Sequence, residues 1–327
     1  MAPLITNIYT ADPSAHVFEG KVYIYPSHDR ETDIQFNDNG DQYDMADYHV
    51  FSTESLDPAA PVTDHGVVLR MEDVPWVSKQ LWAPDAAFKD GKYYLVFPAR
   101  DKQGIFRIGV AVGDRPEGPF APEENYIQGS YSIDPAVLVD DDNEAYLYFG
   151  GLWGGQLQCY QKGNDAFDAA WTGPKEPSGE GVYALGPRVA RLSPDMRSLA
   201  TEVQEIEILD PDTGKKILAD DHDRRFFEAA WCHKRNGLYY FSYSTGDTHY
   251  LCYATGTSPT GPFTYGGRIL EPVLGWTTHH SIVEFQGRWW LFHHDCELSG
   301  GVDHLRSVKV KEIFYDKDGK IVPEKPE

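Results

Sequence analysis

Four carboxylates and one histidine stand at matching places along the chain, each before a short apolar stretch that leads to a glycine or asparagine. They are Asp12, Asp85, Asp134, Glu228 and His280. If the fold gathers these groups, their like charges raise one another's pKa, and such clusters are candidates for functional sites. Two carboxyl groups, one protonated and one ionised, can protonate the leaving oxygen of a glycosidic bond and activate a water molecule.

The neighbours of these residues suggest unequal roles. Glu228 has apolar residues on both sides, and such a setting raises the pKa of a carboxyl, as a general acid at neutral pH requires. Asp12 and Asp134 each precede a proline, where an aspartate also serves simply to cap a turn. For Asp85 we expect a mainly structural role.

The elements that must position these residues repeat along the sequence. Each of the five opens a β-hairpin pattern of apolar residues, a Gly or Asn turn, and a strand rich in aromatic residues. Residues 107–112 and 251–255 add a third strand with a Pro- and Gly-rich exit. Three or four short strands repeated five times predict an all-β fold, a five-bladed β-propeller. The five opening residues should then meet near one mouth of its central channel.

The repeats are unevenly spaced, because the first and third carry polar or Gly-rich insertions near residues 30–46 and 163–177. No long segment has helical periodicity, and we identify no domain linker. Residues 1–327 are therefore predicted to form a single domain. The tail from Ser307 alternates with period two, and we expect it to close the ring beside an N-terminal strand near residues 5–9.

The charge of the chain limits its partners. A net charge of −22 argues against nucleic acid and against an anionic membrane surface, and is compatible with a neutral small oligosaccharide. No apolar run approaches the ~20 residues that span a bilayer, and the first residues do not have the pattern of a secretory signal. The four cysteines lack C-x-x-C spacing and need no disulfides. We expect a cytoplasmic protein, and the sequence leaves homo-oligomerisation open.

Five short motifs together resemble glycoside hydrolase family 43 over essentially the whole chain. In order they are Ala11-Asp12-Pro13-Ser14, Trp82-Ala83-Pro84-Asp85, Ile133-Asp134-Pro135, Phe227-Glu228-Ala229 and His279-His280-Ser281-Ile282-Val283. The resemblance implies a five-bladed propeller and hydrolysis with inversion of configuration. It also implies that Asp12 is the general base, Glu228 the general acid, and Asp134 the carboxylate that tunes Glu228 and orients the sugar.

The resemblance further implies a calcium ion in the central channel. His280 matches the position of the family's histidine ligand, and His279 is the alternative. The resemblance implies that this histidine binds the ion together with water molecules, whereas calcium on its own prefers oxygen ligands.

Four more residues are candidates for substrate binding. Arg306 resembles an arginine that contacts substrate in related enzymes, and a surface ion pair is its alternative role. Trp82 could form a wall of the sugar pocket or pack in the core. His28 and Asp29 end the first hairpin, where members of the family line the pocket.

Within the family, we expect an exo-acting β-xylosidase that releases xylose from the non-reducing end of short β-1,4-xylooligosaccharides. Cleavage of α-L-arabinofuranosides is also expected, since xylose and arabinofuranose place similar hydroxyls. An endo- or exo-arabinanase is the alternative. The retaining, invertase-like propellers differ in every motif, and a non-catalytic sugar-binding propeller would not need all three carboxylates.

Overall fold

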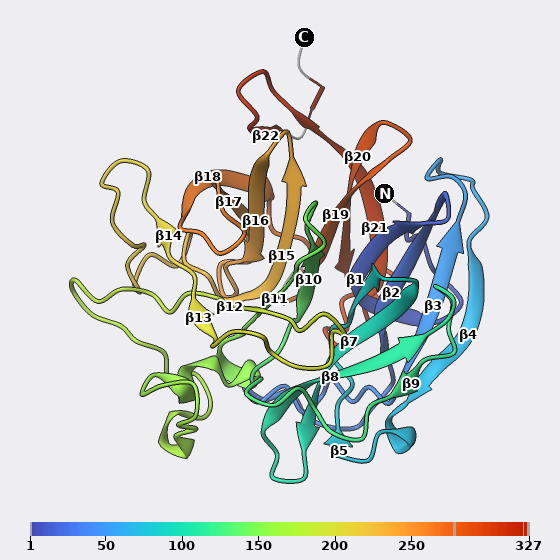
Figure 1. The fold of residues 1–327 in the computed structure, drawn as a ribbon, viewed down its shortest axis with the longest axis horizontal. Coiled ribbons are helices and arrows are strands. Elements are labelled where there is room, and N and C mark those ends of the chain that lie inside the picture. The colour runs from blue at the N-terminus through green and yellow to red at the C-terminus, as the bar shows by residue number, and fades with distance from the viewer. Residues whose placement is uncertain (1, 277–278, 323, 326–327) are drawn as a thin grey trace.

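The fold is a ring of five β-sheets around a central axis (Figure 1). The computed structural model describes residues 2–276, 279–322 and 324–325. Each sheet is one blade, and the blades follow one another in chain order. The predicted all-β, five-bladed propeller is confirmed.

The first two blades are contributed by the N-terminal part of the chain. Blade one contains β1 (Tyr9–Phe18), β2 (Lys21–Asp29), β3 (Asp47–Thr53) and β4 (Thr63–Arg70). Blade two contains β5 (Val77–Lys79), β6 (Asp85–Lys89), β7 (Lys92–Asp101), β8 (Phe106–Gly113) and β9 (Ala121–Pro122).

The other three blades complete the ring. Blade three contains β10 (Ala136–Val139), β11 (Ala145–Phe149), β12 (Arg188–Arg191) and β13 (Gln204–Glu205). Blade four contains β14 (Ile208–Leu209), β15 (Glu228–Arg235), β16 (Leu238–Ser244), β17 (Leu251–Gly256) and β18 (Phe263–Leu270). Blade five contains β19 (His280–Phe285), β20 (Arg288–Asp295), β21 (Ser307–Tyr315) and β22 (Ile321–Val322).

The innermost strands are the first strands of the five predicted hairpins. They are β1, β6, β10, β15 and β19, and each contacts the next around the ring. In four blades this hairpin turns at a residue followed by glycine, both with positive φ, as a type I′ turn requires. These pairs are Glu19-Gly20 (52° and 79°), Asp90-Gly91 (50° and 79°), Asn236-Gly237 (51° and 77°) and Gln286-Gly287 (53° and 73°).

The N-terminal segment runs beside the last blade. The Leu4 amide donates to the Val308 carbonyl at 2.7 Å, and the Thr10 amide donates to the Arg306 carbonyl at 2.9 Å. The first and last blades are thereby joined by backbone hydrogen bonds.

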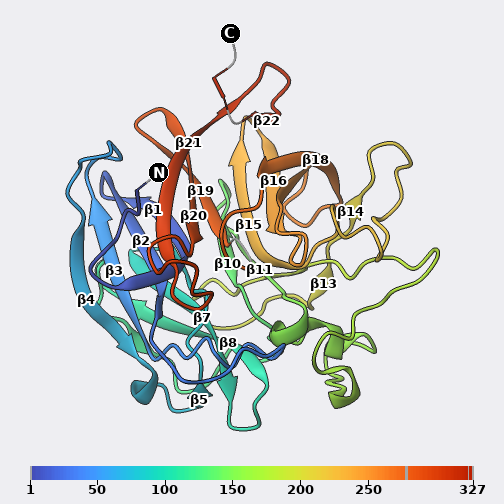
Figure 2. The same ribbon diagram turned by 180° about the vertical axis from the view of Figure 1, so that it is seen from behind.

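Two long connections leave the blades and meet each other. Residues 30–46 join β2 to β3, and residues 150–187 join β11 to β12 and hold three short 3₁₀ turns, η2 (Trp153–Gly155), η3 (Leu157–Tyr160) and η4 (Ala169–Trp171). A further turn, η1 (Met71–Asp73), follows β4. Figure 2 shows the blue 30–46 segment reaching the green segment that contains η2. A side chain on Gly154 would lie 3.0 Å from the backbone of Asn39, so the two connections pack directly together.

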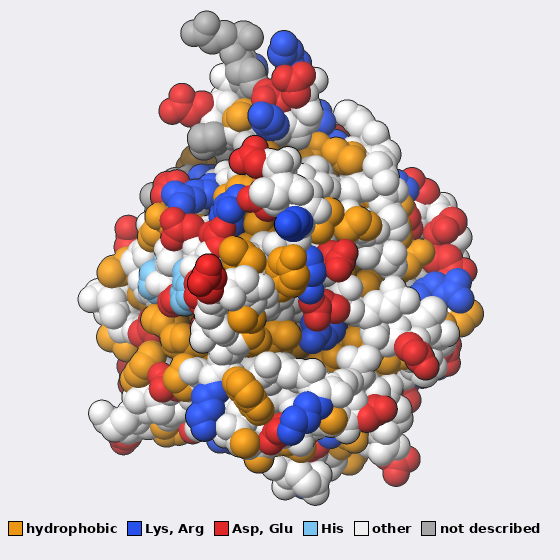
Figure 3. Space-filling view, turned by 90° about the vertical axis from the view of Figure 1, so that its left-hand side faces the viewer, with side chains coloured by type: hydrophobic (Ala, Val, Ile, Leu, Met, Phe, Trp, Pro, Cys, Tyr) orange, Lys and Arg blue, Asp and Glu red, His pale blue; other side chains and the backbone are white. Residues whose placement is uncertain are grey.

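The surface carries charges of both signs. On the face seen in Figure 3, acidic and basic side chains are interspersed, and the hydrophobic ones lie in small separate groups. In the described part of the chain, no helix is both long and apolar enough to span a bilayer.

Candidate active site

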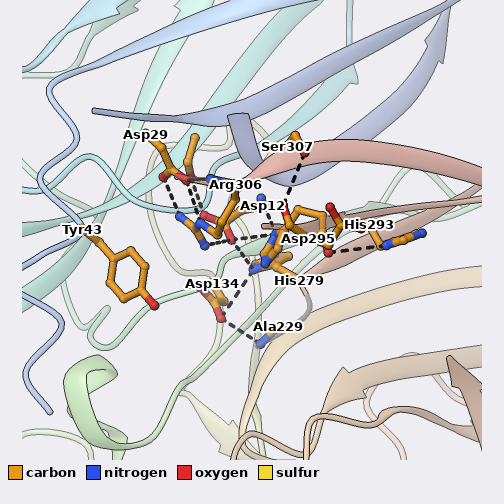
Figure 4. Close-up of polar contacts among 12 residues, drawn as sticks. Asp12, Asp29, Tyr43, Asp134, Ala229, His279, His293, Asp295, Arg306 and Ser307 are labelled. Carbon is orange, nitrogen blue, oxygen red and sulfur yellow. Dashed lines mark hydrogen bonds and ion pairs between the residues drawn. The ribbon is translucent and has the colours of Figure 1, made fainter. Parts of the chain in front are cut away.

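A pocket opens where the inner strands begin. Asp12, Asp134 and Glu228 all line it, each from a different blade. Arg306 and His279, which directly precede strands β21 and β19 of blade five, line it as well. Figure 4 shows Asp12, Asp134, His279 and Arg306 turned toward one another. The fold therefore brings the three predicted catalytic carboxylates together.

The backbone around these carboxylates is unusual. Asp12, Asp134 and Ala229, the residue after Glu228, have φ values of 49°, 56° and 62°. Non-glycine residues rarely adopt this conformation, and such strain is concentrated at functional sites. The pairing of β1 with β2 shifts register between Ala11 and Ser14, and β15 shifts after Glu228. These bulges re-aim the side chains from the sheet toward the pocket.

Asp12 is held as an ionised carboxylate. Its Oδ1 accepts from the Arg306 guanidinium at 2.9 Å, and its Oδ2 accepts from the Ser27 hydroxyl at 2.6 Å. Burial alone would raise the pKa of Asp12, but the positive charge of Arg306 and the other polar neighbours outweigh it and lower the pKa to about 2. At neutral pH this carboxylate is thus available to accept a proton.

Asp134 has the opposite tendency. Burial, followed by the negative charges of Glu228 and Asp12, raises the pKa of Asp134 well above its usual value, although its Oδ2 accepts from the Ala229 amide at 2.8 Å. Because repulsion acts on both members, the Asp134–Glu228 pair retains a proton to higher pH than an isolated carboxyl would. One pocket therefore holds a proton acceptor and a proton-holding pair, as acid–base catalysis requires.

Asp29 acts on the pocket through Arg306. It accepts from Nε and Nη2 of Arg306, both at 2.8 Å, and from the Arg306 amide at 2.9 Å. The guanidinium also lies over the Tyr43 ring, 4.8 Å from its centre. Arg306 lines the pocket, whereas Asp29 is buried behind it and does not. Asp29 is therefore a positioning residue and not the pocket-lining residue that the sequence predicts.

Trp82 lines the pocket and also packs against protein. Its ring stacks on Phe106 with centres 5.0 Å apart, and its Nε1 donates to the Tyr43 carbonyl at 3.1 Å. His28 is not among the lining residues, because its ring faces Asp47, with Nδ1 at 2.6 Å from Oδ1. His28 therefore does not lie where the predicted contact with substrate would require it.

The two adjacent histidines of blade five lie differently. His279 lines the pocket, with Nδ1 at 3.7 Å from Asp134 Oδ2 and 3.9 Å from Asp12 Oδ1. His280 is fully buried outside the lining, and its Nε2 is paired with the Ser242 hydroxyl at 2.6 Å. Burial, followed by the neighbouring His279, His233 and His293, lowers the pKa of His280 well below its usual value. The Nδ1 atom of His280 is buried without a hydrogen-bond partner among the described residues, so a ligand role for the predicted His280 stays a prediction. Calcium prefers oxygen ligands, and of the two histidines His279 is the one that lies beside pocket carboxylates, which favours His279.

Asp85 is a structural residue, as expected. It is buried and accepts from His16 Nε2 at 2.7 Å, from the Val137 amide at 2.5 Å and from the Ser14 hydroxyl. These partners come from blades one and three, so Asp85 ties three blades together.

Apart from Trp82, the side walls of the pocket were not predicted from the sequence. They come largely from the two long connections and from the segment before His279, and their aromatic members are Phe36, Tyr43, Trp153 and Trp276. Asp303 ties two of these segments together, since it accepts from the Tyr43 hydroxyl at 2.7 Å and from the Trp276 amide at 2.8 Å. The signal in the sequence that could have indicated these walls is the presence of aromatic residues in polar segments outside the repeats.

Comparison with known proteins identifies close relatives. The chain is 83% identical to xylosidase/arabinosidase 43A of Humicola insolens, with both chains covered completely. It is 59% identical to a xylosidase/arabinosidase of Bacteroides ovatus, covering 98% of this chain and 96% of the other. A β-xylosidase/α-arabinofuranosidase from a compost metagenome, crystallised with xylotriose in a calcium-free form, superposes with a TM-score of 0.95 at 60% identity. That superposition covers 99% of this chain and 97% of the other.

The sequence also matches the family described as glycosyl hydrolases family 43 across residues 3–321, which is nearly its full length. This match agrees with the propeller and with the three carboxylates in the pocket. The chain belongs to glycoside hydrolase family 43.

Proposed function

We propose that the protein is an exo-acting, inverting glycosidase that releases xylose from the non-reducing end of short β-1,4-xylooligosaccharides and also cleaves α-L-arabinofuranosides. The observation that carries the proposal is one pocket that combines ionised Asp12 with Asp134, whose pKa is raised by burial and by the neighbouring Glu228. Relatives named xylosidase/arabinosidase support the choice of sugars.

In this mechanism Asp12 takes a proton from a water molecule as the water attacks the anomeric carbon. Arg306 and Ser27 fix the orientation of the Asp12 carboxylate during that step. Glu228, half-buried at the start of β15, gives its proton to the leaving oxygen. The negative charge of the neighbouring Asp134 makes loss of this proton to solvent less favourable. Because the water displaces the leaving oxygen in one step from the opposite face of the sugar ring, the configuration at the anomeric carbon is inverted.

The two long connections favour exo action. Phe36 and Tyr43 come from the 30–46 segment, and Trp153 comes from η2, so the pocket has walls that the bare propeller lacks. The Phe36 ring, which is 60% exposed, lies 6.5 Å from the Trp276 ring, and together they offer an apolar surface at the mouth. Walls of this kind fit the end of a chain better than its middle.

We also propose that a calcium ion, the cofactor that the family resemblance implies, is held beside His279. There a pocket-lining imidazole lies near carboxylate oxygens of both Asp12 and Asp134. Such a cation would supply positive charge to the floor of the pocket, while the proton transfers remain with the carboxyls. One relative was crystallised in a form described as calcium-free, which is compatible with calcium binding in that relative.

Time-resolved NMR of the first product tests the proposed function. Xylobiose should yield α-xylose before mutarotation, and longer xylooligosaccharides should lose one xylose at a time. An arabinofuranoside should likewise yield the inverted anomer. Retained configuration, internal cleavage, or activity on arabinan alone would contradict the proposal. If wild type and Glu228→Gln were equally inactive yet bound xylooligosaccharides, the protein would be a sugar-binding propeller.

A further inference from the structure

Blade one carries a second group of metal-binding side chains, separate from the pocket. His28 ends β2, Asp47 and His49 lie on β3, and one ligand atom from each comes within 4.8 Å of the others. His28 Nδ1 is 2.6 Å and His49 Nε2 is 3.9 Å from Asp47 Oδ1. None of the three lines the pocket, and all are only partly buried, so an ion from solvent can reach them.

A fourth residue orients this group from the next strand. Asp64 Oδ1 on β4 lies 3.0 Å from His49 Nδ1, and Asp64 is itself fixed by the Asn7 side chain at 2.8 Å and the Gly66 amide at 2.8 Å. When Nδ1 of His49 donates to Asp64, the lone pair of Nε2 is left toward Asp47 and His28. A carboxylate behind a histidine in this way is the usual outer-sphere support of a metal-bound imidazole.

The donor atoms indicate the kind of ion. Two imidazoles and one carboxylate suit zinc and similar divalent transition metals, whereas calcium prefers a shell of oxygens. Zinc bonds of about 2.1 Å in a tetrahedral site place ligand atoms roughly 3.4 Å apart, and water can supply the fourth ligand. The two spacings to Asp47 Oδ1, 2.6 Å and 3.9 Å, lie on either side of that value.

The three side chains lie where a bound ion would hold together the two ends of the 30–46 segment. His28 and Asp47 stand at the two ends of the 30–46 segment, whose residues form one wall of the pocket. A second pair, Arg30 and Asp44, joins the same two ends at 2.8 Å. We infer that His28, Asp47 and His49 bind a zinc-class divalent cation that fastens the base of this pocket wall. This site is independent of the proposed calcium position and of the proposed function.

Zinc binding by metal-free full-length protein tests the inference. A competing fluorescent indicator should report one tight equivalent of Zn²⁺ in wild type and weak or no binding at this site in His28→Gln and His49→Gln. Asp64→Asn should weaken binding by about 10–100-fold, the usual effect of losing an outer-sphere partner. Saturating Zn²⁺ should also raise the melting temperature of wild type but not of His49→Gln, since an ion that binds only the folded state stabilises it. Ca²⁺ should not compete.

His65→Gln is the matched control, because exposed His65 lies on the same blade and pairs with Ser52 outside the group. It should bind zinc as wild type does. Metal-free His49→Gln should melt near wild type, so that lost binding is not lost folding. Unchanged zinc affinity in both His28→Gln and His49→Gln would overturn the inference. So would loss of the tight equivalent in His279→Gln with retention in His49→Gln, because the zinc would then lie in the pocket.

Discussion

Asp12 and Arg306 are 294 positions apart in the sequence, and their side chains are in direct contact. This contact decides the charge of the proposed general base. The guanidinium is itself fixed by two hydrogen bonds that it donates to Asp29, so its position depends on a residue that does not line the pocket. The charge of Asp12 therefore rests on a buried chain of three residues.

Replacing Arg306 should change the pH dependence of activity. Arg306 lowers the pKa of Asp12, so Arg306→Gln should raise that pKa and shift the acidic limb of kcat/KM to higher pH. A shift of about one pH unit or more is expected from removing an adjacent opposite charge. The measurement is kcat/KM on an aryl xyloside across the acidic range. Arg288→Gln, which loses an exposed pair with Glu312, should leave the limb in place. An unshifted limb in Arg306→Gln would show that Asp12 does not control it.

Removal of either reacting carboxyl should reduce turnover strongly. Asp12→Asn and Glu228→Gln should each lower kcat on xylobiose by roughly 10²-fold or more, the scale of general acid–base catalysis. For Glu228→Gln the loss should shrink on substrates with acidic leaving groups, because those need no protonation. Asp12→Asn should show no such dependence. Glu284→Gln, exposed on β19, is the control. Near-wild-type turnover in either variant would contradict the assignment.

Single residues also show where sequence reasoning ends. Adjacent side chains on a strand point to opposite sides, so a position known to within one residue does not give its direction. His279 faces the pocket and His280 does not. Asp29 turns to Arg306, whereas His28 turns to Asp47. In both pairs the residues could be found from the sequence, and the choice between them needed the structure.

At the scale of elements, the pocket depends on how the 30–46 segment packs against blade two. Gly40 lies in this segment with φ of 69°, and a Cβ there would be 2.7 Å from the Trp82 ring. The Gln80 amide fixes the same turn by donating to the Gly40 carbonyl at 2.7 Å. Glycine is therefore required at position 40 for a close approach as well as for its conformation.

Gly40→Ala should damage the pocket more than the fold. The methyl group would displace Trp82 or the segment, so kcat/KM should fall about tenfold or more, mainly through KM. Gly66→Ala is a matched control, since Gly66 also has positive φ, 78°, but open space around it. Both variants share the cost of placing alanine at positive φ, about 1 kcal/mol. Urea unfolding and steady-state kinetics separate the effects. Equal kinetics in the two variants would show that the contact with Trp82 is unimportant.

The repeated hairpins were predictable because each one combines an alternating apolar strand with an X-Gly or Asn turn, both of which are local signals. The connections that wall the pocket have neither. Residues 30–46 have no regular strand or helix, and their course is set by contacts with Trp82 and with Gly154 of the third blade. Such contacts join distant segments, and nothing in the local sequence encodes them.

At the scale of the whole molecule, the contacts that close the ring lie beside the residues of the candidate site. The hydrogen bond from the Thr10 amide to the Arg306 carbonyl, 2.9 Å long, lies two residues from Asp12. The backbone pairing of the first and last blades therefore positions Arg306 next to Asp12. Loosening this closure should affect both stability and the charge of Asp12.

The packed interior of blades four and five should make the protein sensitive to mild acid. Burial lowers the pKa of His233 to about 3 and of His293 to about 4. These imidazoles ionise near pH 6.5 once unfolded, so between pH 6.5 and about 4 the unfolded state binds more protons. The free energy of unfolding should therefore fall as pH falls through this range. Protonation of Asp134, whose folded pKa is raised, acts in the opposite direction and makes a comparison of variants necessary.

His233→Gln isolates this effect. The amide can keep a hydrogen bond to the Tyr315 hydroxyl, which His233 Nε2 contacts at 2.7 Å, but it cannot take up a proton on unfolding. Below pH 6.5 the stability of wild type should therefore fall more steeply than that of the variant, by about 1.4 kcal/mol per pH unit, the value for one proton. Urea titrations at pH 7, 6 and 5 measure the slopes. His65→Gln, an exposed control, should match wild type. Parallel curves for His233→Gln and wild type would mean that His233 gains its proton in the folded state as readily as in the unfolded one, so that the acid sensitivity would have to come from other groups.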